Sequence, residues 1–403
     1  MTYDVLFYNI LANTANNYPR VVTQITPAEE AANLFPTLAP KVATVPPLNP
    51  VTFRFINAPE DIQNPTTHFW NLSVQREIGS NYIFEVGYTG NRSYHQLRQR
   101  ETNPGVLTAT QAAAVIATDN ANITVPRLNP NWGSRVLLET TSNAEYHAGY
   151  AKFDRRMSKG LQIGANYTWS ANLSDNDEAF TVTDLTASTP QLPQDYFNLR
   201  NEWSRSAFDR PHRFVVHYMY EIPWFASSSA ALSHVFGGWG IAGFTEFQSG
   251  QPFTIVTGVD TAGVRDLASA FPGRPNYNPN GMFKKDPVTG DLRTFTTPLD
   301  GTGIVVVPLG RNGILANSMP GGGNLGRNTF RGPSFQNWNF ALTKKISIKE
   351  GWQVQLRSDF INLWNHNNFA NPESKMSSPS FGSNTATLVT DARQILLSAK
   401  IRF

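Results

Sequence analysis

The chain has 403 residues, of which 16% are charged and 12% aromatic, and its formal net charge is +3. The charged share is well below the roughly 25% of ordinary soluble domains, and so small a net charge gives no reason to expect a nucleic-acid partner. The absence of cysteine excludes disulfides, thiolate metal sites and a cysteine nucleophile. No apolar run reaches the roughly 18 residues of a membrane-spanning helix, and residues 1–10 do not have the basic start and apolar core of a signal peptide.

Alternation of apolar and polar residues predicts a series of antiparallel strands along the chain. In chain order, we expect strands over residues 3–12, 72–78, 82–88, 146–157, 161–169, 213–222, 239–247, 338–348, 352–360 and 393–403. Between them, short connections alternate with long stretches rich in Pro, Gly and Asn, over residues 13–67, 91–144, 173–211, 251–334 and 366–391.

Loops of this length are uncommon in compact soluble domains, whereas outer-membrane barrels alternate short periplasmic turns with long extracellular loops. We therefore expect an all-β fold, an antiparallel up-and-down transmembrane β-barrel of about ten strands in the outer membrane. Residues 1–403 would form one partial barrel domain, with a strand at 1–12, a long loop at 13–67, and barrel strands and loops over 68–403. The last strand would then run inward and end at the periplasmic side.

The last strand alternates most clearly. Ile395, Leu397, Ala399, Ile401 and Phe403 are apolar, and all the residues between them except Leu396 are polar. Successive side chains of a strand point to opposite faces, so one face of this strand is apolar and the other polar. A final strand of this kind is typical of a membrane barrel.

The aromatic residues predict two membrane girdles. Under the expected strand directions, Tyr82, Trp224, Trp239, Trp352 and Phe403 lie at the periplasmic end, and Trp70, Trp169, Trp338 and Trp364 lie at the outer end. Trp352 and Trp364 would stand about 30 Å apart along the barrel axis, close to the roughly 25 Å apolar band with its flanking girdles. A soluble β-protein could show such a pattern by coincidence.

No catalytic, cofactor or metal site stands out, so we do not expect an enzyme. His212 and His217 would face opposite sides of one strand and cannot share a metal ion. Residues 175–178 lack the spacing of a calcium loop and are expected to be a solvated loop. The charges at 154–156 and 206–213 would either pair in a polar lumen or face water. Residues 321–326 precede a strand rather than a helix, which argues against a phosphate loop.

Four segments together resemble the barrel of TonB-dependent receptors of the Oar-like group: residues 64–90, 325–339, 356–372 and the terminal strand. The resemblance spans roughly residues 50–403. It implies a barrel of about 22 strands that surrounds an N-terminal plug engaging TonB, often after a carboxypeptidase-regulatory-like domain. This sequence contains no plug, so we expect a fragment whose contact with the TonB complex runs through a missing N-terminal part. The resemblance also implies that Leu397, Ala399, Ile401 and Phe403 form a signal read by the outer-membrane assembly machinery.

Three functions remain open. The first is the C-terminal barrel portion of a TonB-dependent receptor that contacts outer-membrane lipid, binds an unknown extracellular ligand and takes part in its transport. The second is a barrel without energised transport, such as an adhesin or a passive pore. The third is a soluble secreted β-rich binding protein, in which Val354, Leu356 and Phe360 would accept lysine without cost.

Overall fold

The computed structural model describes residues 55–57, 61–105, 126–177, 192–224, 234–256, 273–274, 276–277, 304–305, 323, 325–349, 352–375, 378 and 392–403. The expected strand at 3–12 lies outside these residues. Among the described residues, no helix is long and apolar enough to cross a membrane.

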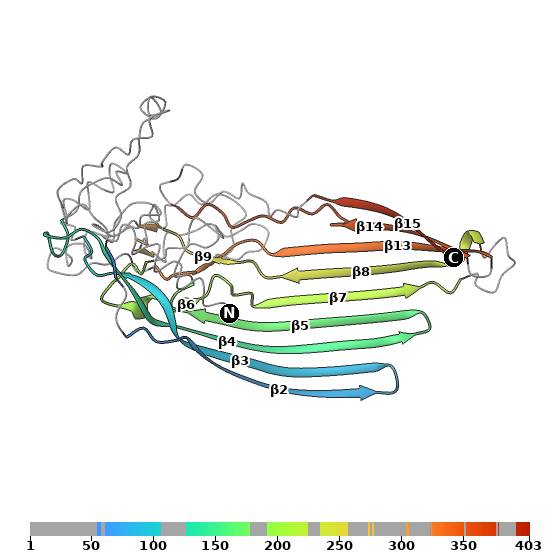
Figure 1. Cartoon of the computed structure of the whole chain (residues 1–403), viewed down its shortest axis with the longest axis horizontal. Coiled ribbons are helices and arrows are strands. Elements are labelled where there is room, and N and C mark those ends of the chain that lie inside the picture. The colour runs from blue at the N-terminus through green and yellow to red at the C-terminus, as the bar shows by residue number, and fades with distance from the viewer. Residues whose placement is uncertain are drawn as a thin grey trace, which may run out of the picture.

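One large antiparallel sheet organises the described chain (Figure 1). Nine of its strands follow each other in space in the order in which they follow each other along the chain, so the sheet is an up-and-down meander. These strands are β2 (Thr66–Ile78), β3 (Tyr82–Glu101), β4 (Arg135–Ser158), β5 (Leu161–Ser174), β7 (His212–Glu221), β8 (Trp239–Gln248), β13 (Phe335–Lys349), β14 (Trp352–Ile361) and β15 (Gln394–Arg402).

Short elements complete the described structure. β1 (Phe55–Asn57) pairs with β4 and β6 (Ser204–Arg205) pairs with β5, which brings the sheet to eleven strands. Two small pairs lie outside the sheet, β9 (Pro252–Phe253) with β12 (Phe330–Arg331), and β10 (Asn276–Tyr277) with β11 (Ile304–Val305). A 3-10 turn, η1, covers Leu199–Glu202. β2 and β15 form the two edges, and in the described part of the chain the sheet does not close.

The expected all-β, antiparallel architecture is confirmed, and each expected strand within the described residues is present. The turns that join β2 to β3 and β4 to β5 lie at one end of the sheet together with the C-terminus, and the strand ends from which the long connections leave lie at the other end (Figure 1). We call these the turn end and the loop end. β7, β8 and β14 have ten residues each, which matches the roughly 9–11 residues of a tilted membrane-spanning strand.

The prediction of a loop over residues 91–144 was wrong at both its ends. β3 continues to Glu101 and β4 begins at Arg135, so this pair of strands extends beyond the others at the loop end (Figure 1). Polar residues occupy both faces of the extension, so no alternation marks it in the sequence. Its pairing also shifts register between Ser93 and Gln96, next to His95 with its positive φ of 56°. Such irregularities bend a strand and hide its periodicity.

Candidate functional site

One face of the sheet is a continuous apolar surface. On β3 the even-numbered residues Tyr82, Phe84, Val86 and Tyr88 are exposed, and the register places Ile78, Val74 and Leu72 of β2 beside them. The same face continues across the sheet through Ile163, Tyr167, Phe214, Val216, Ile241, Phe340, Leu342, Val354, Leu356, Phe360, Ile395, Leu397 and Ile401. An exposed apolar surface of this extent marks contact with a partner or a membrane.

The opposite face is mainly polar, and many of its charges are paired. Arg213 donates to Glu246 at 2.7 Å, Lys345 to Glu221 at 2.7 Å and Arg357 to Asp359 at 2.7 Å. The Tyr150 hydroxyl donates to Glu85 Oε1 at 2.8 Å, and Lys152 pairs with Asp154 at 3.0 Å. Asp154 is therefore paired on this face, but its partner Lys152 belongs to the same strand, β4, and not to a neighbouring one.

Glycines on this sheet receive aromatic rings from the neighbouring strand. The ring of Tyr150 covers Gly87 directly opposite, and the ring of Tyr218 covers Gly243 in the same way. A Cβ at Gly87 would lie 2.6 Å from the Tyr150 hydroxyl oxygen, so no larger residue fits while the ring holds its position. Aromatic rings across from glycine help to set the register of a sheet.

The expected girdle residues lie toward the two ends of the sheet. Tyr82, Trp239 and Trp352 are the first residues of β3, β8 and β14 at the turn end, and exposed Trp224 follows β7 there. The Trp352 and Phe403 ring centroids are 5.6 Å apart. At the loop end, Trp70 lies over Gly90, and the rest of the set is Trp169, Trp338 and Trp364. β14 ends at Ile361, because Asn362 adopts a positive φ of 51°, so Trp364 lies beyond the strand.

Basic residues also lie on the apolar face, among them Arg155, His147, His212 and Lys344. The Tyr88 hydroxyl lies 2.6 Å from His147 Nδ1, and the Tyr167 hydroxyl lies 2.8 Å from His212 Nδ1. Each of these two pairs shares a hydrogen bond. Since His217 lies over Gly164 on the opposite face, the expectation that His212 and His217 face opposite sides is confirmed. No group of three His, Asp or Glu side chains in the described ranges is arranged to hold a metal ion.

Lys344 lies on the same face opposite Trp239, and it is buried. Its ammonium group donates to the carbonyl oxygens of Val235 and Gly237 and lies 5.2 Å from the Trp239 ring centroid. Residues 234–238 of the connection between β7 and β8 therefore cover this charge on the apolar face. A lysine facing lipid requires such compensation, because an uncovered charge is costly there.

The loop end contains a buried polar core centred on Asp177. This carboxylate accepts hydrogen bonds from Arg327, Asn328, Ser174, Ser206 and the backbone N–H of Ala207. Arg327 also donates to the carbonyl oxygens of Glu202 and Ser174. Residues separated by up to 153 positions are thereby tied together. The prediction of a solvated loop at residues 175–178 was wrong for 175–177, because the Asp177 side chain is only 2% exposed and Asp175 pairs with Arg98 at 2.5 Å. Residue 178 lies outside the described residues.

A second buried ion pair adjoins this core. Arg274 Nη1 donates to Glu202 Oε2 at 2.7 Å, and both side chains are almost fully buried. Burial alone would raise the pKa of Glu202, but the charge and hydrogen bond of Arg274 outweigh that effect, so the pKa lies below its usual value. Gln194 joins the pair to the chain, with its backbone N–H donating to Glu202 and its side-chain N–H donating to the Gly323 carbonyl oxygen.

Asp209 shows that the charges at residues 206–213 are paired and do not simply face water. It is fully buried and accepts a hydrogen bond from Arg331 at 2.7 Å, with Arg205 at 3.4 Å. The segment is therefore part of the ion-paired loop end rather than a row of solvated charges. Beside it, burial and then the charge of Arg331 lower the pKa of Arg210 to about 10.

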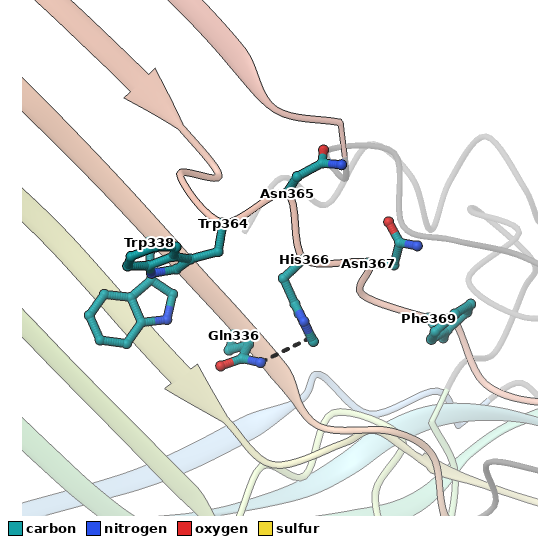
Figure 2. Close-up of a pocket in the computed structure, with 7 residues that line it drawn as sticks. All are labelled: Gln336, Trp338, Trp364, Asn365, His366, Asn367 and Phe369. Atoms are coloured by element: carbon teal, nitrogen blue, oxygen red, sulfur yellow. Dashed lines mark hydrogen bonds between the residues drawn. The ribbon is translucent and has the colours of Figure 1, made fainter.

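A cavity of about 450 Å³ opens at the loop end of β13 and β14 (Figure 2). Gln336 and Trp338 of β13 form one side, and Trp364, Asn365, His366, Asn367 and Phe369, which follow β14, form the other. The Gln336 side chain donates to His366 Nε2 at 3.1 Å, and Asn362 holds His366 through its backbone N–H and carbonyl oxygen. Sequence patterns do not reveal this site, because its two sides come from separate segments and the local pattern of residues 364–369 is that of a loop.

A sheet with one apolar and one polar face, strands of membrane-spanning length and long connections at one end defines an outer-membrane β-barrel protein. A family model described as an outer membrane beta barrel domain matches residues 1–395. The chain belongs to this family, and it is a protein of the outer membrane.

Solved structures give distant likenesses. The outer membrane transporter YddB from Escherichia coli has 8% identity and a TM-score of 0.39, with 88% of this chain and 34% of that chain covered. The pyoverdine outer membrane receptor FpvA from Pseudomonas aeruginosa PAO1, bound to pyoverdine, has 11% identity and a TM-score of 0.31, with 83% and 29% covered. The chain thus spans about a third of the length of either protein. No curated protein matches it.

Proposed function

We propose that this chain is the C-terminal barrel portion of a TonB-dependent receptor that binds a substrate at its loop end and takes part in transport across the outer membrane. The observation that carries the proposal is the buried core around Asp177. It ties three loop segments into one structure above the polar face, which suits a surface that must hold its shape to bind a ligand. A passive pore needs only a polar lumen.

The residues of this core support the TonB-dependent interpretation in a second way. Arg327, Asn328 and Arg331 belong to segment 325–339, one of those that resemble Oar-like receptors, and all three make the buried contacts described above. The substrate would bind from outside. The TonB complex would act through an N-terminal plug, and further strands would pair with the edges β2 and β15.

Ion conductance of the protein encoded by the whole reading frame, purified from the outer membrane and placed in a planar lipid bilayer, tests the proposal. We expect an in-frame plug upstream of residue 1 and no steady conductance, because a plug closes the lumen. A steady, large conductance from a protein without a plug would instead establish the passive pore.

We further propose that the apolar residues of β15 are read by the assembly machinery, and that the eight predicted girdle residues other than Phe403 contact the lipid interface. Leu397, Ala399 and Ile401 pair with β14 on the apolar face, and Phe403 is 89% exposed. Phe403→Ala should reduce the amount of folded protein in outer-membrane fractions, whereas Arg402→Ala on the other face should not. Equal yields of the two variants would contradict this role.

A further inference from the structure

A row of aromatic rings crosses the apolar face at the loop end. Phe214 of β7 stacks on Phe247 of β8, with ring centroids 6.5 Å apart. Phe247 in turn meets Trp338 of β13 edge-to-face at 5.5 Å. Trp364 then stands with Trp338 around the cavity of Figure 2. Adjacent strands thus present a continuous aromatic floor.

A row of uncharged polar groups borders this floor on its outer side. His212 lies two residues farther toward the loop end than Phe214 on β7, and Gln336 lies two residues farther than Trp338 on β13. A second hollow of about 340 Å³ contains His212, Ser249 and Gln336, so Gln336 joins it to the cavity of Figure 2. Together, the two hollows form one groove.

The lining of the groove selects a class of ligand. Among the residues that the structure describes, no Lys, Arg, Asp or Glu lines either hollow, which disfavours a phosphate or another strongly charged group. Because the Gln336 amide donates to His366 Nε2, its oxygen is left to accept a hydrogen bond. The exposed amide of Asn367 makes no hydrogen bond within the described part of the chain and offers both a donor and an acceptor. Aromatic faces beside neutral amides suit a sugar ring, with its apolar C–H face and its hydroxyl edge.

The position of the groove selects the source of that sugar. Long loops of outer-membrane barrels face the exterior, so the groove lies at the level of the outer leaflet, whose main lipid is a glycolipid. Below the aromatic row, the apolar face continues through Phe340 and Leu342 of β13 and Phe360 of β14. We propose that the groove binds the saccharide part of an outer-leaflet glycolipid while its acyl chains lie along this surface.

Native mass spectrometry of the full-length protein in a nonionic detergent, titrated with lipopolysaccharide, tests the proposal. Gln336→Ala should weaken binding about three- to ten-fold through the loss of a hydrogen bond. Trp364→Ala should weaken it about ten-fold through the loss of an aromatic contact surface. Asn337→Ala is the matched control, because Asn337 is the neighbour of Gln336 and lies on the polar face. Retained heat-modifiable migration in gels would show that each variant is folded.

Two further probes separate the alternatives. Phosphatidylglycerol supplies a phosphate and acyl chains without this saccharide, and deacylated core oligosaccharide supplies sugars without chains. Selective binding of lipopolysaccharide, lost in the two groove variants and kept in Asn337→Ala, would support the proposal. If phosphatidylglycerol bound equally well, the groove would not recognise sugar. If the free oligosaccharide bound equally well, the ligand would not have to be a membrane lipid. If both groove variants kept their affinity for lipopolysaccharide, the binding site would lie elsewhere.

Discussion

Two adjacent valines in the middle of β7 distinguish the faces of the sheet. Val216 lies on the apolar face between Ala165 and Thr245, and Val215 lies on the polar face opposite Glu246. In a tilted strand, Val216 is roughly 10 Å from the His212 end and roughly 13 Å from the Glu221 end. It is therefore close to the midplane of the roughly 25 Å apolar band.

Lysine at these two positions should have very different effects. At the midplane of a barrel, a lipid-facing lysine costs about 2–4 kcal/mol, so Val216→Lys should lower the folding equilibrium constant about 30- to 1,000-fold. Val215→Lys places its amine near Glu246 in the polar lumen, and its effect should remain within about 0.5 kcal/mol.

Urea titration of tryptophan fluorescence in lipid vesicles measures both variants against the parent protein. A large loss for Val216→Lys and a small one for Val215→Lys would establish which face meets lipid. If the two substitutions cost the same, or if Val216→Lys costs nothing, the assignment of the faces is wrong.

Three other changes probe the sheet and the loop end. Gly87→Ala should destabilise the sheet by about 1–3 kcal/mol, because the tyrosine ring that covers this glycine must move. Gly149→Ala, where a Cβ would meet nothing within 4 Å, is the control in the same urea titration. Arg327→Met leaves Asp177 buried without its counter-charge and should cost about 3 kcal/mol, seen as faster hydrogen exchange at the loop end with the strands unchanged. The pKa of Glu202 lies below its usual value in the folded protein. The contribution of Glu202 to stability is therefore complete above the unfolded pKa of about 4.3 and is lost as the pH falls through the folded pKa. Protease cleavage at the loop end should rise over that acidic range, and cleavage that does not depend on pH would count against this role of Glu202.

The strands could be predicted from the sequence where alternate side chains face lipid and a water-filled lumen, because apolar and polar residues then alternate along the chain. β5 and β15 illustrate this, because their register follows directly from the alternation of apolar and polar side chains. That signal fails in the outer part of β3 after Ser93. There the strand is held by backbone pairing and by ion pairs such as Arg98 with Asp175, and hydrophobic periodicity is lost.

The loop end was not predictable, because its stabilising contacts join distant positions. Asp177 and Arg327 are 150 residues apart, and nothing near either residue in the sequence indicates the other. A carboxylate in a polar loop is usually solvated, so a local interpretation of residues 175–178 favours water over burial. Only the three-dimensional arrangement shows that these loops contain a polar core.

The buried ammonium group of Lys344 bears on how this protein can be altered. Most connections at the turn end are tight hairpins that serve only to reverse the chain, but the segment between β7 and β8 also provides the carbonyl oxygens that surround this amine. If that segment were shortened to a hairpin, or if a tag were inserted into it, a bare cation would be left in hydrocarbon. The length of this connection is therefore constrained by electrostatics, and an epitope or fusion partner is better placed at the turn between β2 and β3, where Gly79 lies in open space.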